Sequence, residues 1–442
     1  MKSCNNDGPT LLDYADQLIR DYHLKTRTDT KDTYYYNSIK GVYVNADLFL
    51  DEICQRIIPD CDTAMIIEIK KIIGRKTHIE PSKFNHASNI INLENGLLNL
   101  EDLKLLADGT LDLENIKLLP HNHEVITTVQ LPVSFDKLAK CPKIKKFHED
   151  VLKPEDINLA YEIAGWFLWS AYHIHKAIML YGKGRNGKGT MLRLWQVFLG
   201  DTNCSHISLQ KLVNDKFAAS GLLDKAANIY GDLPKSDLSE TDIFKCVTGE
   251  DTISVERKFG HAFSLLNRAK LAFSANNLPK SIDDSEGFFS RWIIIEFNRI
   301  FGSNDIDSNL DEKLHTKEEL SGYLNLVLEG LTRLRANNWK FSYSKTLEDV
   351  TRMYKRLSDH VYAFLEDCYE YSPNETVTKQ ELFKHYGRYA KEHNLNPISM
   401  KKFGSAIIDQ SYLPVEEVKI GSTGSQSKAW LGLKEKSKFM FG

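Results

Sequence analysis

The sequence lacks the cysteine arrangement that a disulfide framework or a zinc site requires. Its seven cysteines are odd in number, are scattered along the chain and never form a C-x-x-C pair. This pattern argues against a disulfide-stapled scaffold and predicts a protein of the reducing cytoplasm. The cysteines are Cys4, Cys54, Cys61, Cys141, Cys204, Cys246 and Cys368.

Long apolar runs, a basic excess and a signal-peptide pattern are also missing. The most apolar stretch, residues 157–173, is interrupted by Asn158 and Glu162, and it is shorter than the roughly 20 residues that span a bilayer. We therefore expect a buried helix there and no membrane partner. The opening segment MKSCNNDGPT does not follow the basic-then-apolar order of a signal peptide. A net charge of -3 gives no basic field over the whole chain, so any contact with DNA must come from local cationic groups.

The chain has instead the pattern of a multidomain α/β protein. Residues 1–140 show short amphipathic helical patterns and the strand-like run IINLENGLLNL, which predict an α+β accessory domain. Within residues 141–340, a helical collar precedes short apolar runs separated by helical segments, as in a parallel sheet. Residues 341–442 are typical of a small helical domain with a β-wing over 412–430. The expected sheet strands are AIMLYG, ANIYGD, KLAFSAN and RWIIIEF.

The most specific motif is the glycine-rich segment GKGRNGKGT, which lies between the apolar run AIMLY and the helical run MLRLWQVFL. A strand, a glycine-rich turn and a helix in this order indicate a phosphate-binding loop, because backbone N–H groups and the helix dipole face the phosphates. We expect ATP here, with Lys188 at the β- and γ-phosphates. A chance glycine-rich turn is the alternative, and the flanking strand and helix disfavour it. The loop consists of Gly182, Lys183, Gly184, Arg185, Asn186, Gly187, Lys188, Gly189 and Thr190.

A magnesium site is expected beside this loop. Asp232 ends the run ANIYGD, and phosphate-loop enzymes hold Mg²⁺ or its water with a carboxylate at the end of a neighbouring strand. Leu233 follows where many such enzymes have a second acid, so Asp232 would serve both the metal and the attacking water. Gly189 occupies the place directly after Lys188, which leaves Thr190 as the candidate hydroxyl ligand. The alternative for Asp232 is a turn aspartate at a strand end.

These motifs resemble the superfamily 3 helicases of phages, plasmids and poxviruses, in particular the family of phage and plasmid primase-helicase C-terminal regions. Among its members, the Rep replication helicases of staphylococcal pathogenicity islands are most similar. The resemblance implies an AAA+ core, a hexameric ring and ATP-driven unwinding of DNA to initiate replication of a mobile genetic element. It rests on NLENGLLNL, LPVSFDKLAKCP, GKGRNGKGT, NIYGDLP, TGEDTISVERKFG, LAFSANNLP and DDSEGFFSRWIIIEF.

The resemblance also implies roles for two further polar residues. Asn276, at the end of LAFSAN, corresponds to a sensor that hydrogen-bonds the attacking water or the γ-phosphate. Arg291, which opens RWIIIEF, resembles an arginine finger that reaches ATP on the neighbouring subunit and is worth about 10³–10⁵ in rate. A turn asparagine and a locally paired arginine are the alternatives.

The segment ISVERKFGHAF is the first candidate for DNA contact, because it places cationic and aromatic groups at the tip of an expected β-hairpin. In the resembled family this hairpin lines the central pore. Lys258 and His261, with Arg257 beside them, would contact successive phosphates of one strand, and Phe259 would contact a sugar or base. A solvated, charged hairpin is the alternative.

The C-terminal domain is the second candidate for DNA contact. Its segments resemble a winged helix-turn-helix domain, with residues 400–408 as the recognition helix. Lys401 and Lys402 at the start of that helix would contact the DNA backbone or bases. Two lysines on a helix also occur on an ordinary solvated face.

Two other functions stay open on the sequence alone. A nucleotide kinase would also use GKGT but has neither a pore hairpin nor a distal DNA-binding domain. An origin-binding AAA+ assembly ATPase would share the core and winged helix without processive unwinding. We expect no primase activity, since residues 1–130 show no paired acids with a partnering histidine, and His121 and His123 are expected in a loop. A partner primase or polymerase of the replisome is expected instead.

Overall fold

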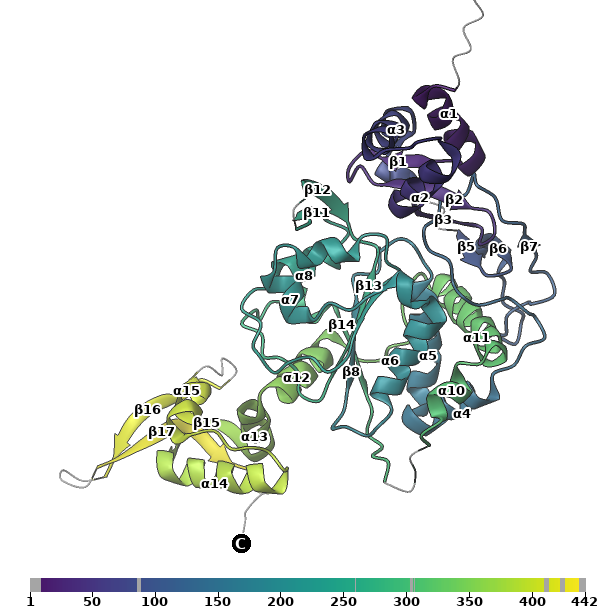
Figure 1. The fold of residues 1–442 in the computed structure, drawn as a ribbon. Coiled ribbons are helices and arrows are strands. Elements are labelled where there is room, and N and C mark those ends of the chain that lie inside the picture. The colour runs from purple at the N-terminus through teal and green to yellow at the C-terminus, as the bar shows by residue number, and fades with distance from the viewer. Residues whose placement is uncertain are drawn as a thin grey trace, which may run out of the picture. The chain divides into compact units, whose positions relative to one another are not determined.

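The computed structural model describes residues 9–85, 89–258, 260–302, 305, 307–408, 413–421 and 426–436. The chain divides into two compact units, and Figure 1 labels their helices and strands. The first unit holds the described residues up to Pro234 together with 238–276 and 281–344, and the second holds 235–237, 277–280 and the described residues from Lys345 onward. No helix in this described part combines the length and the apolar character that a membrane crossing needs.

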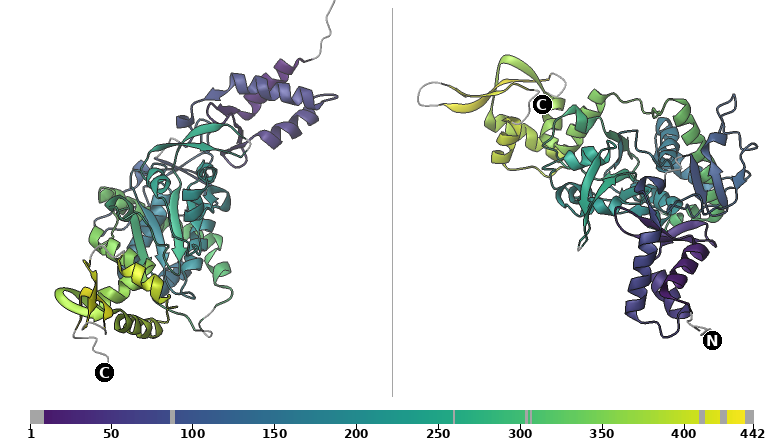
Figure 2. Two further views of the ribbon diagram at one scale, coloured as in Figure 1. Left: turned by 90° about the vertical axis from the view of Figure 1, so that its left-hand side faces the viewer. Right: turned by 90° about the horizontal axis from the view of Figure 1, so that it is seen from above.

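The first unit begins with a small α+β module, whose helices gather at its N-terminal end (Figure 2, purple). Thr10 caps the first helix, because its hydroxyl accepts from the N–H of Asp13 while the Asp13 carboxylate accepts from the N–H of Thr10. A four-stranded sheet of order β3-β2-β1-β4 supports the helices. The elements are α1 (Leu11–Tyr22), β1 (Lys25–Arg27), β2 (Thr33–Asn37), β3 (Val42–Asn45), α2 (Asp47–Ile57), α3 (Thr63–Lys76), β4 (His78–Ile79) and η1 (Pro81–Lys83).

A second small sheet, of order β5-β6-β7, connects this module to the central part of the unit. The run IINLENGLLNL forms the antiparallel pair β5–β6, as its alternation indicated. The elements are β5 (Ile90–Leu93), β6 (Gly96–Asn99), η2 (Leu100–Asp102) and β7 (Leu118–Leu119).

The central part of the first unit is built on a parallel five-stranded sheet of order β14-β8-β13-β10-β9. The α/β class and the four expected strands are therefore confirmed. All six residues of β13 are buried, as in a sheet covered on both faces. The sheet strands are β8 (Ala177–Tyr181), β9 (Cys204–Ser205), β10 (Ala227–Tyr230), β13 (Lys270–Ala275) and β14 (Trp292–Glu296).

Helices cover the two faces of this sheet (Figure 1). On one face, Ile178 and Ile293 belong to a large apolar cluster with residues of α5, α6 and α11. On the other face, Trp292 contacts Phe273, and the ring of Phe244 from α8 stacks on it with centroids 4.8 Å apart. The remaining elements are α4 (Pro142–Val151), α5 (Pro154–Phe167), α6 (Lys188–Leu199), η3 (Asp201–Asn203), α7 (Leu209–Asn214), η4 (Ala218–Leu222), α8 (Asp242–Val247), β11 (Thr252–Glu256), β12 (Ala262–Leu266), α9 (Glu286–Phe289), α10 (Leu310–Leu314) and α11 (Lys317–Ala336).

Helices α5 and α11 pack at close range through glycines. A Cβ atom on Gly330 would lie 2.6 Å from the carbonyl carbon and oxygen of Tyr161, and one on Gly165 would lie 2.8 Å from the N–H nitrogen of Leu331. Glu162, only 1% exposed, pairs with Arg333 at 2.9 Å across the same contact. The glycines allow the backbones to approach, and the ion pair fixes the register of the two helices.

The second unit has its own apolar core, formed by residues such as Phe364, Tyr386, Phe403 and Trp430. Its three-stranded sheet has the order β15-β17-β16, and β16 and β17 form the expected C-terminal hairpin. Residues 412 and 422–425 of that expected wing lie outside the described residues. The elements are α12 (Leu347–Ser358), α13 (His360–Cys368), β15 (Tyr369–Thr378), α14 (Lys379–Glu392), α15 (Met400–Ile408), β16 (Glu416–Ile420) and β17 (Ser427–Glu435).

Replacing Gly330 by alanine tests the close contact between α5 and α11. We expect Gly330→Ala to lower the free energy of unfolding by about 1–3 kcal/mol, because the new methyl group has no space against the α5 backbone. The matched control is Gly74→Ala in α3, where nothing lies within 4 Å of the new Cβ and the helix gains up to about 1 kcal/mol. Chemical denaturation measures both, and an equal effect of the two substitutions would contradict the packing.

Candidate functional site

The carboxyl ends of three neighbouring strands bring the sequence-predicted phosphate residues to one edge of the central sheet. Strand β13 pairs with β8 on one side and with β10 on the other, all in parallel. Lys188 follows β8, Asn276 follows β13 and Asp232 follows β10. All three side chains line one cavity of about 620 Å³.

The glycine-rich loop after β8 turns directly into helix α6, which begins at Lys188. Gly187 has a φ of 91°, and a Cβ there would lie 2.6 Å from the side chain of Val151. Both the left-handed backbone and the close approach therefore require glycine. The carbonyl of Arg185 accepts from the N–H of Phe301, and the Asn186 side chain donates to the carbonyl of Phe297. These contacts hold the loop at the start of the helix.

The Lys188 ammonium is surrounded by oxygen acceptors. It donates to the carbonyl of Gly182 at 2.5 Å and to the side-chain oxygens of Asn186 and Asn276, each at 3.1 Å. Burial lowers the pKa of Lys188, while the nearby Asp232 carboxylate acts in the opposite direction. A buried cation in an oxygen-lined pocket gains from an anion that offers further acceptors.

Asp232 adopts a left-handed backbone with a φ of 50°. The hydroxyl of Ser274 in β13 accepts from the N–H of Asp232 at 3.1 Å, and the carboxylate is exposed at the cavity. Backbone strain of this kind is tolerated where the surroundings hold it, and it concentrates at functional sites.

Sequence reasoning missed several residues of this cavity. The guanidinium of Arg193, one helical turn after Thr190, donates to the Thr190 hydroxyl at 3.1 Å and pairs with Asp311. Ser274 is a single hydroxyl in an apolar strand, and its position two residues before Asn276 was the available signal. His206, whose Nδ1 donates to the carbonyl of Ile229, follows a strand of two residues that no pattern indicates. Gln196 also lines the cavity.

The lining of this cavity fits a magnesium-bound nucleotide triphosphate. A cation, an amide and loop N–H groups suit the phosphates, and an exposed carboxylate with a nearby hydroxyl suits Mg²⁺, which takes oxygen ligands. The candidate metal oxygens are those of Asp232 and Thr190. In the described ranges, no group of three histidine, cysteine or acidic side chains is placed to hold a metal ion by itself, so substrate phosphates would have to complete the coordination.

Arg291 lies at the opposite end of the sheet. Strand β14 pairs with β8 from Trp292 opposite Ala177 to Glu296 opposite Tyr181, so Arg291 is separated from its own phosphate loop by the length of β8, about 16 Å. Its Nε donates to the hydroxyl of Thr248 at 2.8 Å, and its other nitrogens donate to backbone carbonyls. Burial lowers the pKa of Arg291, and Asp251 opposes that shift.

The expected hairpin is present as β11 paired with β12 in antiparallel register. At its tip, Lys258 and His261 are exposed, whereas Arg257 is engaged: its Nη1 lies 2.8 and 3.1 Å from the two carboxylate oxygens of Asp32 in the N-terminal module. Phe259 lies outside the described residues. Of the four predicted DNA contacts, Lys258 and His261 are thus exposed side chains, and Arg257 is in an ion pair.

The two C-terminal lysines lie on the first turn of α15. Lys401 and Lys402 are both exposed, beside Met400, whose side chain is also exposed. Both lysines belong to the second unit.

Comparisons with known proteins divide this chain into two matched parts. Residues 5–153 match the family described as D5 N terminal like, and residues 180–291, which contain the phosphate loop, match the family described as Family of unknown function (DUF5906). Each match covers less than half of the chain.

A protein of Sputnik virophage named "Putative helicase V13" is 22% identical over 352 residues, or 71% of this chain. The chain spans 42% of the length of that relative. Among solved structures, the apo NrS-1 C terminal region has a TM-score of 0.52 at 12% identity and covers 97% of this chain and 100% of its own. The mixed α/β fold with a five-stranded parallel sheet is thus similar to that of the NrS-1 region.

The left-handed turn at Asp232 predicts different effects of two substitutions. Asp232→Asn should leave the free energy of unfolding within about 0.5 kcal/mol, because asparagine tolerates this conformation. Asp232→Ala should lower it by about 1–2 kcal/mol. Asp237→Ala serves as the control, since Asp237 is also exposed but lies outside the left-handed region. Urea denaturation distinguishes the three, and equal stability of the two Asp232 variants would contradict the backbone argument.

Proposed function

We propose that this protein is an ATP-dependent DNA helicase of the AAA+, superfamily 3 type, which acts in replication. The observation that carries the proposal is the convergence of Lys188, Asn276 and Asp232 in one cavity, with the strand that bears Asn276 between the other two. The helicase name of the virophage relative and the D5 N terminal like match support a relation to primase-helicase proteins. The closer likeness to staphylococcal Rep helicases stays a prediction.

The side chains of the cavity have distinct tasks in hydrolysis. Lys188 exchanges its contacts with Gly182 and Asn276 for phosphate oxygens, and its buried position strengthens that interaction. Asn276, released from Lys188, orients the attacking water with its amide. The Asp232 carboxylate accepts a hydrogen bond from that water, and the Ser274 hydroxyl holds the backbone N–H of Asp232. Mg²⁺, when bound with ATP, neutralises charge on the β- and γ-phosphate oxygens.

The proposal includes an oligomeric ring, for which a hexamer is expected. Arg291 is at the wrong end of the sheet to reach its own phosphate loop, whereas a head-to-tail ring would present it to the loop of the next subunit. Its present bonds to Thr248 and to two carbonyls would hold the guanidinium in a defined orientation at that interface.

DNA contact is proposed at two places. The exposed Lys258 at the tip of the β11–β12 hairpin can neutralise a phosphate of a single strand, and the exposed ring of His261 can donate a hydrogen bond to another phosphate. From α13 onward, the second unit has the element order helix, strand, two helices and a two-stranded wing, which supports a winged helix-turn-helix with α15 as its recognition helix. Lys401 and Lys402 would then contact DNA, and a partner primase or polymerase remains a prediction.

An assembly ATPase that binds an origin without processive unwinding is the second candidate. It would share the phosphate site, Arg291 and the C-terminal domain. The hairpin with its exposed Lys258 favours the helicase, because a translocating ring needs a moving contact with the strand in its pore. A nucleotide kinase is disfavoured by the same hairpin and by the second unit.

A substitution at Lys258 should impair DNA unwinding without impairing ATP hydrolysis. We expect Lys258→Ala to reduce strand displacement on a forked duplex at least tenfold while the rate of ATP hydrolysis without DNA stays within twofold of the wild type. The matched control is Lys71→Ala in α3, an exposed lysine of the N-terminal module. Unchanged unwinding by Lys258→Ala would exclude the hairpin as the translocating contact, and hydrolysis without unwinding by the wild type would favour the assembly ATPase.

A subunit-mixing experiment tests whether Arg291 completes the neighbouring site. Lys188→Ala and Arg291→Ala proteins should each hydrolyse ATP at least a hundredfold more slowly than the wild type. Mixed in equal amounts under subunit exchange, they should recover activity, since roughly a quarter of interfaces in a randomly mixed ring combine an intact Lys188 with an intact Arg291. A mixture as inactive as its two components would contradict a composite site.

A further inference from the structure

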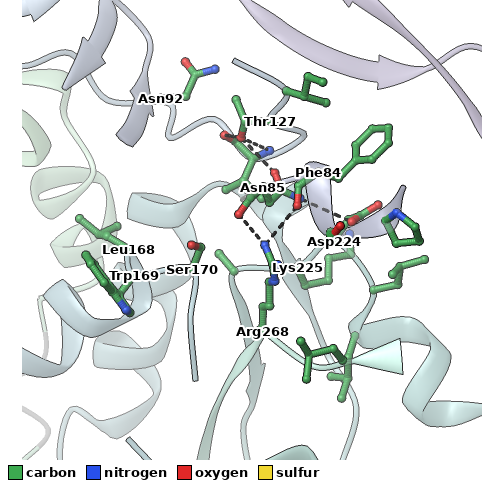
Figure 3. Close-up of a pocket in the computed structure, with 18 of the residues that line it drawn as sticks. Phe84, Asn85, Asn92, Thr127, Leu168, Trp169, Ser170, Asp224, Lys225 and Arg268 are labelled. Carbon is green, nitrogen blue, oxygen red and sulfur yellow. Dashed lines mark hydrogen bonds between the residues drawn. The ribbon is translucent and has the colours of Figure 1, made fainter. Parts of the chain in front are cut away.

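A second cavity lies in the first unit, away from the phosphate site, between the N-terminal module and the central sheet. It has a volume of about 360 Å³, and its lining includes Phe84, Ile126, Phe167, Trp169 and Leu266 (Figure 3). Residues of the module, the segment after α5, the loop before β10 and the base of the β11–β12 hairpin all contribute walls. A volume of this size suits a single small molecule and not a polymer strand.

Arg268 supplies the cavity with a cation that lacks a carboxylate partner. Its Nη1 donates to the carbonyls of Phe84 and Asn85 at 3.1 and 2.5 Å (Figure 3), and it forms no ion pair in the described part of the chain. Burial lowers the pKa of Arg268, an effect that Asp224 opposes. A guanidinium taken out of water at this cost is stabilised by an anion that reaches it.

Asp224, the carboxylate that acts on the pKa of Arg268, already accepts hydrogen bonds from other side chains. Asp224 accepts from Arg27 at 2.8 Å and from the hydroxyl of Tyr34 at 3.0 Å. Arg27 also pairs with Asp29 at 2.9 Å. Asp29 and Asp224 together carry one more charge than Arg27, so they offset the charge of Arg268 from a distance, but neither carboxylate forms an ion pair with its guanidinium.

We propose that this cavity binds a small, flat organic anion, with its aromatic body against Phe84, Phe167 and Trp169 and its negative group on Arg268. Aromatic walls favour a ring system over an aliphatic chain, and a guanidinium prefers a carboxylate, phosphate or sulfonate through charge-assisted hydrogen bonds. The site is separate from the ATP site and does not depend on the proposed helicase activity. Because its walls come from both the module and the central part, binding stabilises their contact.

The probe for this site is anilinonaphthalene sulfonate, a fluorescent aromatic anion, titrated into the full-length protein. We expect saturable binding of one equivalent and a rise in the melting temperature with dye concentration. Its uncharged relative, phenylnaphthylamine, should bind at least tenfold more weakly. Equal affinity for the charged and uncharged dyes, or the absence of a saturable site, would overturn the proposal.

Variants locate the binding. Arg268→Gln should weaken the dye at least about tenfold, and Arg268→Lys should restore part of the affinity. Ser170→Phe places a large side chain in the cavity without removing a charged group, and it should abolish binding. This variant keeps the test available even if Arg268→Gln does not fold. The matched control Arg75→Gln, an exposed arginine of α3, and the phosphate-site variant Lys188→Ala should bind like the wild type. Wild-type affinity in folded Ser170→Phe protein would contradict the site.

Discussion

The position of β13 between β8 and β10 is the constraint on which the phosphate site depends. The carboxyl ends of parallel strands lie at the same edge of the sheet. Because β13 lies between β8 and β10, the loop after β8 and the turn after β10 are separated by the width of one strand. The amide of Asn276 fills this space and reaches Lys188 at 3.1 Å, while Ser274 on the same strand supports the turn of Asp232. One buried strand thus positions both Asn276 and the serine that holds the backbone turn of Asp232.

The same sheet separates the two halves of the proposed chemistry. Its carboxyl edge carries the groups proposed to bind phosphate, and its amino edge carries Arg291. In the proposed ring, a head-to-tail repeat of this arrangement would supply each site with the arginine of the next subunit. The ion pair of Arg257 with Asp32 also ties the hairpin to the N-terminal module, so a phosphate would have to compete with Asp32 for this guanidinium.

Sequence patterns predicted β8, β10, β13 and β14 correctly, because these strands are mostly apolar and almost entirely buried. They missed β1 to β4, which are rich in polar and tyrosine residues, the two-residue strand β9, and β15, which is mostly exposed and shows no apolar run. Lys188, Asp232 and Asn276 could be named from motifs, although their roles stay predictions. The distances between them, the support by Ser274 and the contact of Arg193 with Thr190 depend on which strands are neighbours, and periodicity carries no information about that. Arg268 has no motif at all.

The most direct test of the central claim is ATP-dependent strand displacement on a forked DNA duplex by the wild type and by Lys188→Ala, with the oligomeric state of both monitored. We expect unwinding that requires ATP and is lost in the variant, while the variant keeps its assembly. Absence of unwinding by an assembled wild-type protein that hydrolyses ATP, or unwinding that survives the loss of Lys188, would contradict the claim.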